Sequence, residues 1–466
     1  PDPTFSDVHV PITSRFSLCT KKGKEVWIEP IVDKVNKTIN YEIREGGTKE
    51  QIEASKIGTK FGRGANFVCL YSGAAIDPEY VRLCGVEGRM KSTLMAIVAE
   101  GKRGRVYLHP SKDQEKTAYS QQTNIKHDIP LVGKARSSLP LYGMETFSDL
   151  FTDRQLLTLN TFSKLIHEVR SQIEHDALTT GMANEQTPLS DRGTGAKAYA
   201  EAVSVFLSLA IGRFSNRSSS CCIWNAGRET VEQVFGRQAI PMTWDYAESN
   251  AFSNSSGNWI GGGCKYVIEV LKNIPANSFG SITQQDAQLV EYPPNIVIST
   301  DPPYYDNICY ADLSDFFYYW LKPALSSVYP ALFEFIATPK AEELIATPYR
   351  FESKTEAEDF FLNGMGKAIK NMSEQCHKDI PVTIYYAFKQ SEIEKEGISS
   401  TGWSTFLQAV INAGFIIVGT WPVRLELITG LKTGKNVLAT AVVLVCRKRD
   451  QAAPSITRAE FVHELK

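Results

Sequence analysis

The chain has 466 residues, of which 43% are hydrophobic and 22% are charged, and its formal net charge is −2. This length exceeds one ordinary domain and predicts two or three, while the composition is typical of a globular protein. The near-neutral charge provides no general attraction to phosphate, although it permits a local basic groove. No apolar run approaches the roughly 20 residues of a membrane span, and no signal peptide is evident, so we expect no membrane association.

Composition and periodicity divide the chain into five segments. We expect a β-rich domain over residues 1–115, a connecting arm over 116–148, a helical region over 149–277, an α/β domain over 278–450 and a C-terminal tail over 451–466. The nine cysteines show no paired spacing, which suits a reducing compartment and predicts a cytoplasmic protein. The first residue is Pro1 and not methionine, which favours a processed product or a fragment.

Short runs of β-branched and aromatic residues predict the strands of the first segment. They lie at residues 16–19, 25–28, 42–44 and 67–70. Zinc prefers four nitrogen or sulfur ligands in a tetrahedral array. The local candidates are Cys19, Cys69, Cys84 and His9. Their spacings fit no zinc knuckle, so we expect no bound metal, and each cysteine is equally explained as a small core residue.

Helical periodicity dominates the region from residue 149 to residue 277. Thr152 is a candidate N-cap for a helix whose apolar positions run from Leu156 to Val169, and a second helix is predicted over residues 196–214. Between Arg213 and Arg237, arginines alternate with serines and a tryptophan, which suits contact with a nucleic-acid backbone. A helix pair with a solvated polar face explains the same residues, and both interpretations stay open.

Strands and helices alternate in the α/β segment. We expect a short strand at 281–285 that ends at Asp286, a buried strand at 296–298, helices at 313–325, 357–376 and 403–413, and strands at 382–387, 415–421 and 437–446. The aromatic residues of the helix at 313–325 are expected to pack in the core. The alternation predicts a mostly parallel sheet that closes with a terminal strand pair.

The most informative stretch follows the strand at 296–298 and reads Asp301-Pro302-Pro303-Tyr304. Pro302 favours an extended Asp301, and Pro303 fixes its own φ and lacks an N–H. The result is a stiff corner at the carboxyl end of a strand, where open α/β sheets bind ligands. A simple rigid turn is the alternative explanation.

This corner suits chemistry on the exocyclic amine of a base. The amine is a poor nucleophile because its lone pair is delocalised into the ring. Asp301 and the carbonyls of Pro302 and Pro303 can accept its hydrogens and favour a more tetrahedral nitrogen. Tyr304 can stack on the base once the base has left the duplex.

The sequence Asp301-Pro302-Pro303-Tyr304 resembles the Asp-Pro-Pro-Tyr motif of amino-directed nucleic-acid methyltransferases. Further separated blocks resemble the adenine-specific DNA methylases that carry a zinc-ribbon insertion. These blocks are residues 91–100, 235–242, 304–307, 310–318 and 383–390. These blocks carry a resemblance that extends over much of the chain from Val26 to Arg447, and their agreement is far more specific than the tetrapeptide.

The resemblance implies a Rossmann-like methyltransferase sheet, S-adenosylmethionine as methyl donor, and adenine N6 in double-stranded DNA as acceptor. It implies that Asp286 contacts the adenine of the donor, although a plain turn aspartate is an equal alternative. By the same resemblance, Tyr305, Asp306 and Asn307 are candidates for binding the substrate. The family's zinc ribbon has two Cys-x-x-Cys knuckles, of which the second reads Cys69-Leu70-Tyr71-Ser72 here and the first has no counterpart.

The donor site of such enzymes needs a glycine-rich turn after the first strand, where the backbone approaches the donor closely. No convincing copy occurs in this chain, so we expect a sheet that is incomplete at its N-terminal side. An upstream part of the same enzyme or a partner subunit is then expected to supply the turn. A catalytically inactive DNA-binding or assembly subunit is the alternative. Methylation of RNA or of a protein amide is less favoured, because amide-directed relatives prefer Asn at the position of Asp301.

Overall fold

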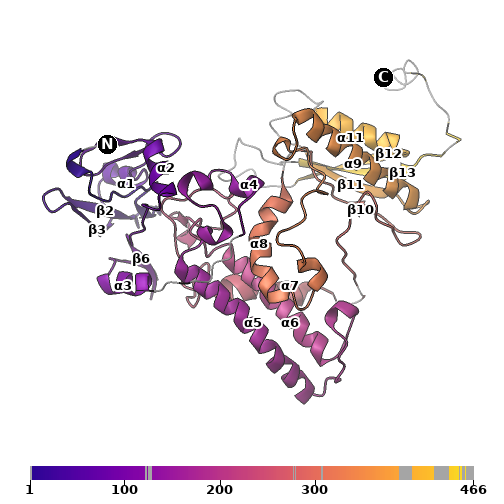
Figure 1. Ribbon diagram of the computed structural model, residues 1–466, viewed down its shortest axis with the longest axis horizontal. Coiled ribbons are helices and arrows are strands. Elements are labelled where there is room, and N and C mark those ends of the chain that lie inside the picture. Colours follow the sequence, from indigo (N-terminus) through magenta and orange to yellow (C-terminus); the bar gives the residue numbers. More distant parts are fainter. Residues whose placement is uncertain are drawn as a thin grey trace. The chain divides into compact units, whose positions relative to one another are not determined.

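The computed structural model describes residues 3–120, 123, 129–275, 278, 280–305, 308–387, 401–424, 440–450, 452, 453 and 457. The chain divides into two compact units, which we call unit 1 (Pro1–Asn277 and Tyr310–Pro339) and unit 2 (Ser278–Cys309 and Lys340–Lys466). Both units combine helices with strands (Figure 1), so the fold class is mixed α/β. Within the described residues, no helix is both long enough and apolar enough to cross a membrane.

Unit 1 begins with an antiparallel sheet of three strands, β1 (Ser17–Cys19), β2 (Val26–Asp33) and β3 (Thr38–Glu45). The turn between β1 and β2 is closed by Lys24 N–H, which donates to the carbonyl of Lys21 at 2.9 Å. The strands predicted near residues 16, 25 and 42 are therefore confirmed. Three two-stranded hairpins follow along the chain: β4 (Phe67–Val68) with β5 (Ala75–Ile76), β6 (Ile97–Gly101) with β7 (Gly104–Leu108), and β8 (Trp224–Asn225) with β9 (Thr230–Val231).

Short helices lie between and after these strands along the chain. They are α1 (Lys49–Ser55), α2 (Pro78–Val86), α3 (Lys112–Ser120), α4 (Gly133–Arg136) and α7 (Lys265–Asn273), with a π-helical turn η5 (Trp259–Cys264) before α7. The single-turn 3-10 helices are η1 (Pro3–Phe5), η2 (Leu139–Tyr142), η3 (Phe147–Leu150), η4 (Leu189–Asp191), η6 (Pro330–Phe333) and η7 (Pro348–Arg350).

Three long helices form the centre of unit 1: α5 (Asp153–Thr179), α6 (Ala196–Ser215) and α8 (Tyr310–Leu325). The sequence predicts all three. The Thr152 hydroxyl accepts from the backbone N–H of Gln155, whose side chain accepts from the N–H of Thr152. This capping box satisfies two backbone donors that have no partner within the helix, and it confirms Thr152 as the N-cap.

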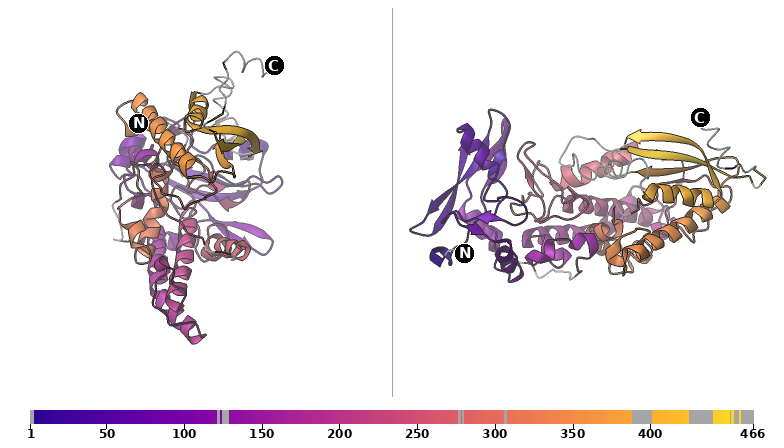
Figure 2. Two further views of the ribbon diagram at one scale, coloured as in Figure 1. Left: turned by 90° about the vertical axis from the view of Figure 1, so that its right-hand side faces the viewer. Right: turned by 90° about the horizontal axis from the view of Figure 1, so that it is seen from above.

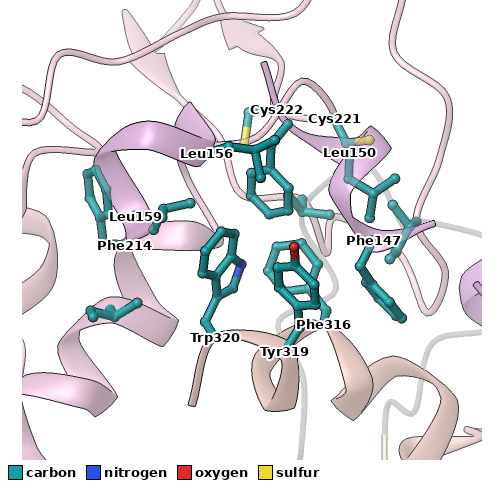
Figure 3. Close-up of a cluster of buried hydrophobic side chains, with 14 of the residues drawn as sticks. Phe147, Leu150, Leu156, Leu159, Phe214, Cys221, Cys222, Phe316, Tyr319 and Trp320 are labelled. Carbon is teal, nitrogen blue, oxygen red and sulfur yellow. The ribbon is translucent and has the colours of Figure 1, made fainter. Parts of the chain in front are cut away.

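The core of unit 1 lies between α8, the start of α5 and the end of α6 (Figure 3). Phe316, Tyr319 and Trp320 of α8 are at most 3% exposed, which confirms that these aromatic residues pack in the core. Burial raises the pKa of the Cys221 and Cys222 thiols in the same cluster to about 12. These thiols therefore stay protonated and act as small apolar side chains.

A glycine and a buried carboxylate attach the segment before η3 to α8. Lys134 N–H donates to Asp312 Oδ2 at 2.9 Å, and Asp312 is only 1% exposed. Gly133 has φ +51°, and a Cβ at this position would lie 2.0 Å from Asp312 Oδ2. Only glycine allows both the backbone conformation and the close approach.

Unit 2 is built on a sheet of four strands in the order β10-β11-β13-β12. The strands are β10 (Ser299–Thr300), β11 (Val382–Ala387), β12 (Phe415–Arg424) and β13 (Thr440–Lys448). β10 is parallel to β11, whereas β13 is antiparallel to both β11 and β12. β10, β11 and β12 therefore run in the same direction, and among the described strands of this sheet only β13 is reversed, because it turns back after β12 and inserts between β12 and β11. The expectation of a mostly parallel sheet that closes with a terminal strand pair is confirmed for these strands.

Two strand predictions for unit 2 need correction. The apolar run 296–298 precedes β10, although His377 N–H and Thr383 N–H donate to the carbonyls of Ile296 and Ile298 at 2.9 and 3.1 Å. Ile298 is 7% exposed and Val297 is 54% exposed, so only alternate residues of the run face the core. Residues 281–285 form no strand and are all exposed. Ile282, their one apolar residue, is 99% exposed, so no buried side chain holds the segment against the core as a strand would require.

Helices α9 (Lys354–Gln375) and α11 (Thr401–Asn412) pack on one face of the sheet (Figures 1 and 2). Both helices and the strand β11 are close to the predicted positions. The buried side chains that join the layers come from α9, α11, β11 and β13, and include Phe361, Met365, Phe406, Ile384 and Leu444. Tyr385 of β11 points away from this core and is 38% exposed.

Candidate functional site

The Asp-Pro-Pro-Tyr stretch lies at the carboxyl end of β10. Within the described residues β10 is an edge strand whose neighbour is β11, with Thr300 in register with Ile384. The Thr383 hydroxyl donates to the Ser299 hydroxyl at 2.8 Å and adds a side-chain contact to this short pairing. Since the two strands are parallel, the residues after Thr300 lie beside the carboxyl end of β11. Open α/β sheets bind ligands at the carboxyl ends of their strands.

Asp301 and Tyr304 lie together at this edge. Asp301 is exposed and Tyr304 is half-buried. The Tyr304 hydroxyl donates to Asp301 Oδ1, and the Tyr304 ring meets the ring of Tyr386 edge-on at 5.6 Å and packs against Ala387 and Ala441. The carboxylate therefore faces solvent, and the ring beside it is held by β11 and β13.

The contact between Tyr304 and Asp301 leaves capacity for a ligand. An ionised carboxylate has about four lone-pair positions on its two oxygens, and the Tyr304 hydroxyl uses one. A ligand amine that approaches from solvent can therefore still donate to Asp301. Pro302 and Pro303 are half-buried between these two residues.

Tyr305 anchors the far end of the corner. Its carbonyl accepts from Ala346 N–H at 2.9 Å, its hydroxyl donates to Glu358 Oε1 at 2.6 Å, and its ring lies edge-on to Phe361 at 5.4 Å. Its φ of +48° is uncommon for a residue other than glycine. The side chain expected to bind substrate is thus engaged with α9. The other two substrate candidates, Asp306 and Asn307, lie outside the described residues.

The hydrogen bond from Tyr305 sets a measurable property of Glu358. This bond is the main cause that lowers the pKa of Glu358, with a further contribution from Lys354. We expect Tyr305→Phe to raise the pKa of Glu358 towards its ordinary value, as measured by an NMR titration of the carboxyl carbon. A group with a lowered pKa in the folded state adds stability above its unfolded pKa, and this stability is lost as the pH falls through the folded pKa. The variant should therefore lose stability at neutral pH but not at low pH.

Tyr385→Phe is the matched control, because Tyr385 lies on β11 and is partly exposed. It should leave the titration of Glu358 unchanged. A Tyr305→Phe protein with an unshifted Glu358 titration would show that the hydroxyl contact is not maintained in solution.

Asp286 caps a turn in the structure. Its carboxylate accepts from Gln288 N–H at 2.8 Å, and its carbonyl accepts from Leu289 N–H at 3.0 Å. The segment is attached to α9, where the Asn371 side-chain amide donates to the carbonyl of Val290 at 2.8 Å. These contacts match the alternative of a plain turn aspartate. The donor-binding role of Asp286 stays a prediction.

The candidate zinc ligands do not form a cluster. Cys19 packs with the β1–β2 core, Cys69 packs in a separate cluster around Phe67, and His9 is exposed. Among the residues that the structure describes, no group of three or more His, Cys, Asp or Glu side chains could hold a metal ion. The cysteines all have free thiols.

Several polar groups between Arg213 and Arg237 have intramolecular partners. The Ser219 and Ser220 hydroxyls donate to the carbonyl of Leu150 at 2.6 and 2.9 Å. Arg213 Nε donates to the carbonyl of Gly262 at 2.9 Å, and its guanidinium lies 3.6 Å from the centre of the Tyr266 ring. The serines are therefore committed to the fold, which favours the structural interpretation for them.

Sequence reasoning missed two residues that shape the corner, Glu358 and Tyr386. Glu358 lies 53 positions after Tyr305, on an amphipathic helix where a glutamate is unremarkable. Tyr386 lies in the strand that pairs with β10, and its aromatic ring could have been noted as a neighbour of the corner once the pairing was assumed.

In comparisons with protein families, curated proteins and solved structures, no match to this chain was found. The proposed function therefore rests on the residues and geometry of the site.

Proposed function

We propose that unit 2 carries the target-base half of a DNA adenine-N6 methyltransferase, which transfers a methyl group from S-adenosylmethionine to an extruded adenine. One observation carries this proposal. An exposed aspartate and a half-buried tyrosine are hydrogen-bonded to each other at the carboxyl end of a parallel edge strand. A carboxylate beside a flat ring matches what an extruded aminopurine needs for recognition.

Each residue of the corner has a role in this proposal. Asp301 accepts a hydrogen of the adenine amine and orients the nitrogen lone pair away from the ring plane. The carbonyls of Pro302 and Pro303 accept the second hydrogen. Tyr304 provides a surface for the base to stack on, and its hydroxyl keeps Asp301 in place. The proton that the amine loses is released to solvent, since no strong base adjoins the corner among its described neighbours.

The arrangement of unit 2 supports a methyltransferase-like sheet that is incomplete at its N-terminal side. The terminal pair β12–β13 closes the sheet in the manner of methyltransferases, with β13 next to β11. Parallel strands are normally covered on both faces, whereas Val297 and Tyr385 are 54% and 38% exposed. β10 is the outermost described strand, and the sheet face that carries Val297 and Tyr385 is exposed. Both features favour a further polypeptide segment that pairs with β10 and covers this face.

The hairpin β4–β5 supports a degenerate zinc ribbon in unit 1. Cys69 and Ser72 lie at the tip of this hairpin, where Gly73 N–H donates to the carbonyl of Cys69 at 2.8 Å. A knuckle in the resembled family has its second cysteine at the position of Ser72. Replacing that cysteine with serine removes a thiolate ligand and leaves the turn as a structural element.

The residues present fit the methyl donor only in part. S-adenosylmethionine supplies an electrophilic methyl group when it is bound. This chain lacks the glycine-rich turn that its methionine portion requires, and Asp286 is engaged in capping a turn. We therefore propose that an upstream part of the same enzyme or a partner subunit completes the donor site.

The chain alone should bind S-adenosylmethionine weakly or not at all. Calorimetric titration of the 466-residue chain checks this expectation. Binding in the micromolar range would contradict it and would show that the donor site lies within the chain. Adding the polypeptide that carries the glycine-rich turn should restore binding.

The second candidate function is a catalytically inactive DNA-binding or assembly subunit that keeps the fold. The missing glycine-rich turn favours it. A methyl-transfer assay and a gel shift on the same DNA, with the completing polypeptide present, distinguish the two candidates. Methyl transfer to adenine supports the enzyme, whereas a gel shift without methyl transfer supports the inactive subunit.

A further inference from the structure

A polar hollow lies in unit 1, between β1, the end of α1 and the start of the β8–β9 hairpin. It has a volume of about 410 Å³, and its lining includes Arg15, Ser17, Thr20, Lys56 and Asn225. None of the described residues that line it is acidic. This volume falls within the range of small-ligand sites.

Backbone hydrogen bonds between its three walls hold the hollow in shape. Phe16 N–H donates to the carbonyl of Ser55 at 2.7 Å, which joins β1 to the end of α1. Thr20 N–H donates to the carbonyl of Ala226 at 3.0 Å, which joins β1 to the hairpin. A site whose walls are fixed in this way loses little entropy when a ligand binds.

Each of the two cations of the hollow has one acidic neighbour. Arg15 Nε lies 3.8 Å from Asp245 Oδ2, beyond hydrogen-bond distance, and its side chain is 40% exposed. Lys56 Nζ contacts Glu53 at 2.6 Å on the surface of α1, and both side chains are over 40% exposed. An exposed pair such as Lys56–Glu53 contributes at most about 1 kcal/mol, so an anion in the hollow can compete for Lys56. Asp245 is only 13% exposed, but its distance from Arg15 Nε leaves the guanidinium able to donate to an anion in the hollow as well.

The hydroxyl groups complete a set of donors suited to an oxyanion. Ser17 is 6% exposed, and Thr20 directly follows the last residue of the same strand. A guanidinium, an ammonium and two hydroxyls can donate together to the oxygens of a tetrahedral anion. Gly227 also lines the hollow and has no side chain to fill it.

We propose that this hollow binds a phosphate group, with Arg15 and Lys56 as the charged contacts and Ser17 and Thr20 as hydroxyl donors. The phosphate belongs either to a free phosphate-bearing molecule or to a DNA backbone. The proposal depends on residues of unit 1 alone and does not rest on the methyltransferase proposal for unit 2.

The test compares the double variant Arg15→Gln/Lys56→Gln with the control Arg82→Gln/Lys49→Gln. The control removes one arginine and one lysine from exposed positions on α2 and α1 that do not line the hollow, so the net charge is the same. One arm titrates each full-length protein with inorganic phosphate by calorimetry in chloride buffer. The other measures binding of a short DNA duplex at several salt concentrations.

We expect the double variant to bind phosphate at least about tenfold more weakly than the control variant. If duplex binding also weakens, and its dependence on salt falls by about one unit of slope per lost contact, the phosphate comes from DNA. If duplex binding is unchanged, the ligand is a free phosphate compound. Equal binding of both ligands by the two variants would overturn the proposal.

A folding control keeps this test decisive. Removing Arg15 takes a positive neighbour from Asp245, whose burial already raises its pKa. If the double variant melts earlier than the control, Lys56→Gln alone replaces it. We expect that single variant to weaken phosphate binding severalfold, and unchanged binding would again overturn the proposal.

Discussion

In the proposed complete methyltransferase, Asp301→Ala is expected to reduce methyl transfer to adenine by roughly 10²–10³-fold, the usual cost of removing one preorganised hydrogen-bonding group from an active site. The variant loses the acceptor that we propose draws the amine out of conjugation, and it loses the partner of the Tyr304 hydroxyl. DNA binding should stay largely intact, because Asp301 contributes no positive charge to phosphate contacts. A methyl-transfer assay combined with a gel shift measures both quantities.

Two further variants make this result specific. Asp359→Ala removes an exposed aspartate from α9 and should leave methyl transfer unchanged. Tyr304→Phe keeps the ring and removes the hydroxyl that contacts Asp301, so we expect an intermediate loss of activity. Full activity of the Asp301→Ala enzyme would remove this carboxylate from the mechanism.

Trp320→Ala is expected to lower the free energy of unfolding of unit 1 by about 3–5 kcal/mol. Trp320 is 1% exposed, and its ring lies edge-on to Phe151 at 5.1 Å and to Tyr319 at 4.8 Å. Figure 3 shows Trp320 and Tyr319 within this buried cluster. Truncation to alanine leaves a large apolar cavity between α5 and α8. Denaturant unfolding followed by circular dichroism measures the change.

Trp320→Phe is the informative comparison. The indole N–H of Trp320 is buried without a hydrogen-bond partner in the described part of the chain. Replacing it with phenylalanine removes that unpaired donor and keeps most of the apolar volume, so the loss should stay below about 2 kcal/mol. Equal losses for the two variants would show that the core around this residue is not packed as described.

The candidate site combines contacts that are local in the sequence with contacts between distant segments. The corner at Asp301-Pro302-Pro303-Tyr304 follows from proline geometry and from its position after an apolar run. The hydrogen bond from Tyr304 to Asp301 spans three residues and is a local feature. The contact between Tyr305 and Glu358 joins residues 53 positions apart. No periodicity in either segment marks that contact, because each residue fits its own element without the other.

The sequence alone determined the elements whose causes are local. Thr152 begins α5 because its hydroxyl and the Gln155 side chain satisfy nearby N–H groups, and residues 382–387 form β11 because they are β-branched, aromatic and mostly buried. The tertiary structure decided that α8 packs with α5 and α6 in unit 1 and that β13 lies between β11 and β12. Local patterns cannot decide such pairings, because the free energy comes from burying apolar surfaces that are distant in the chain.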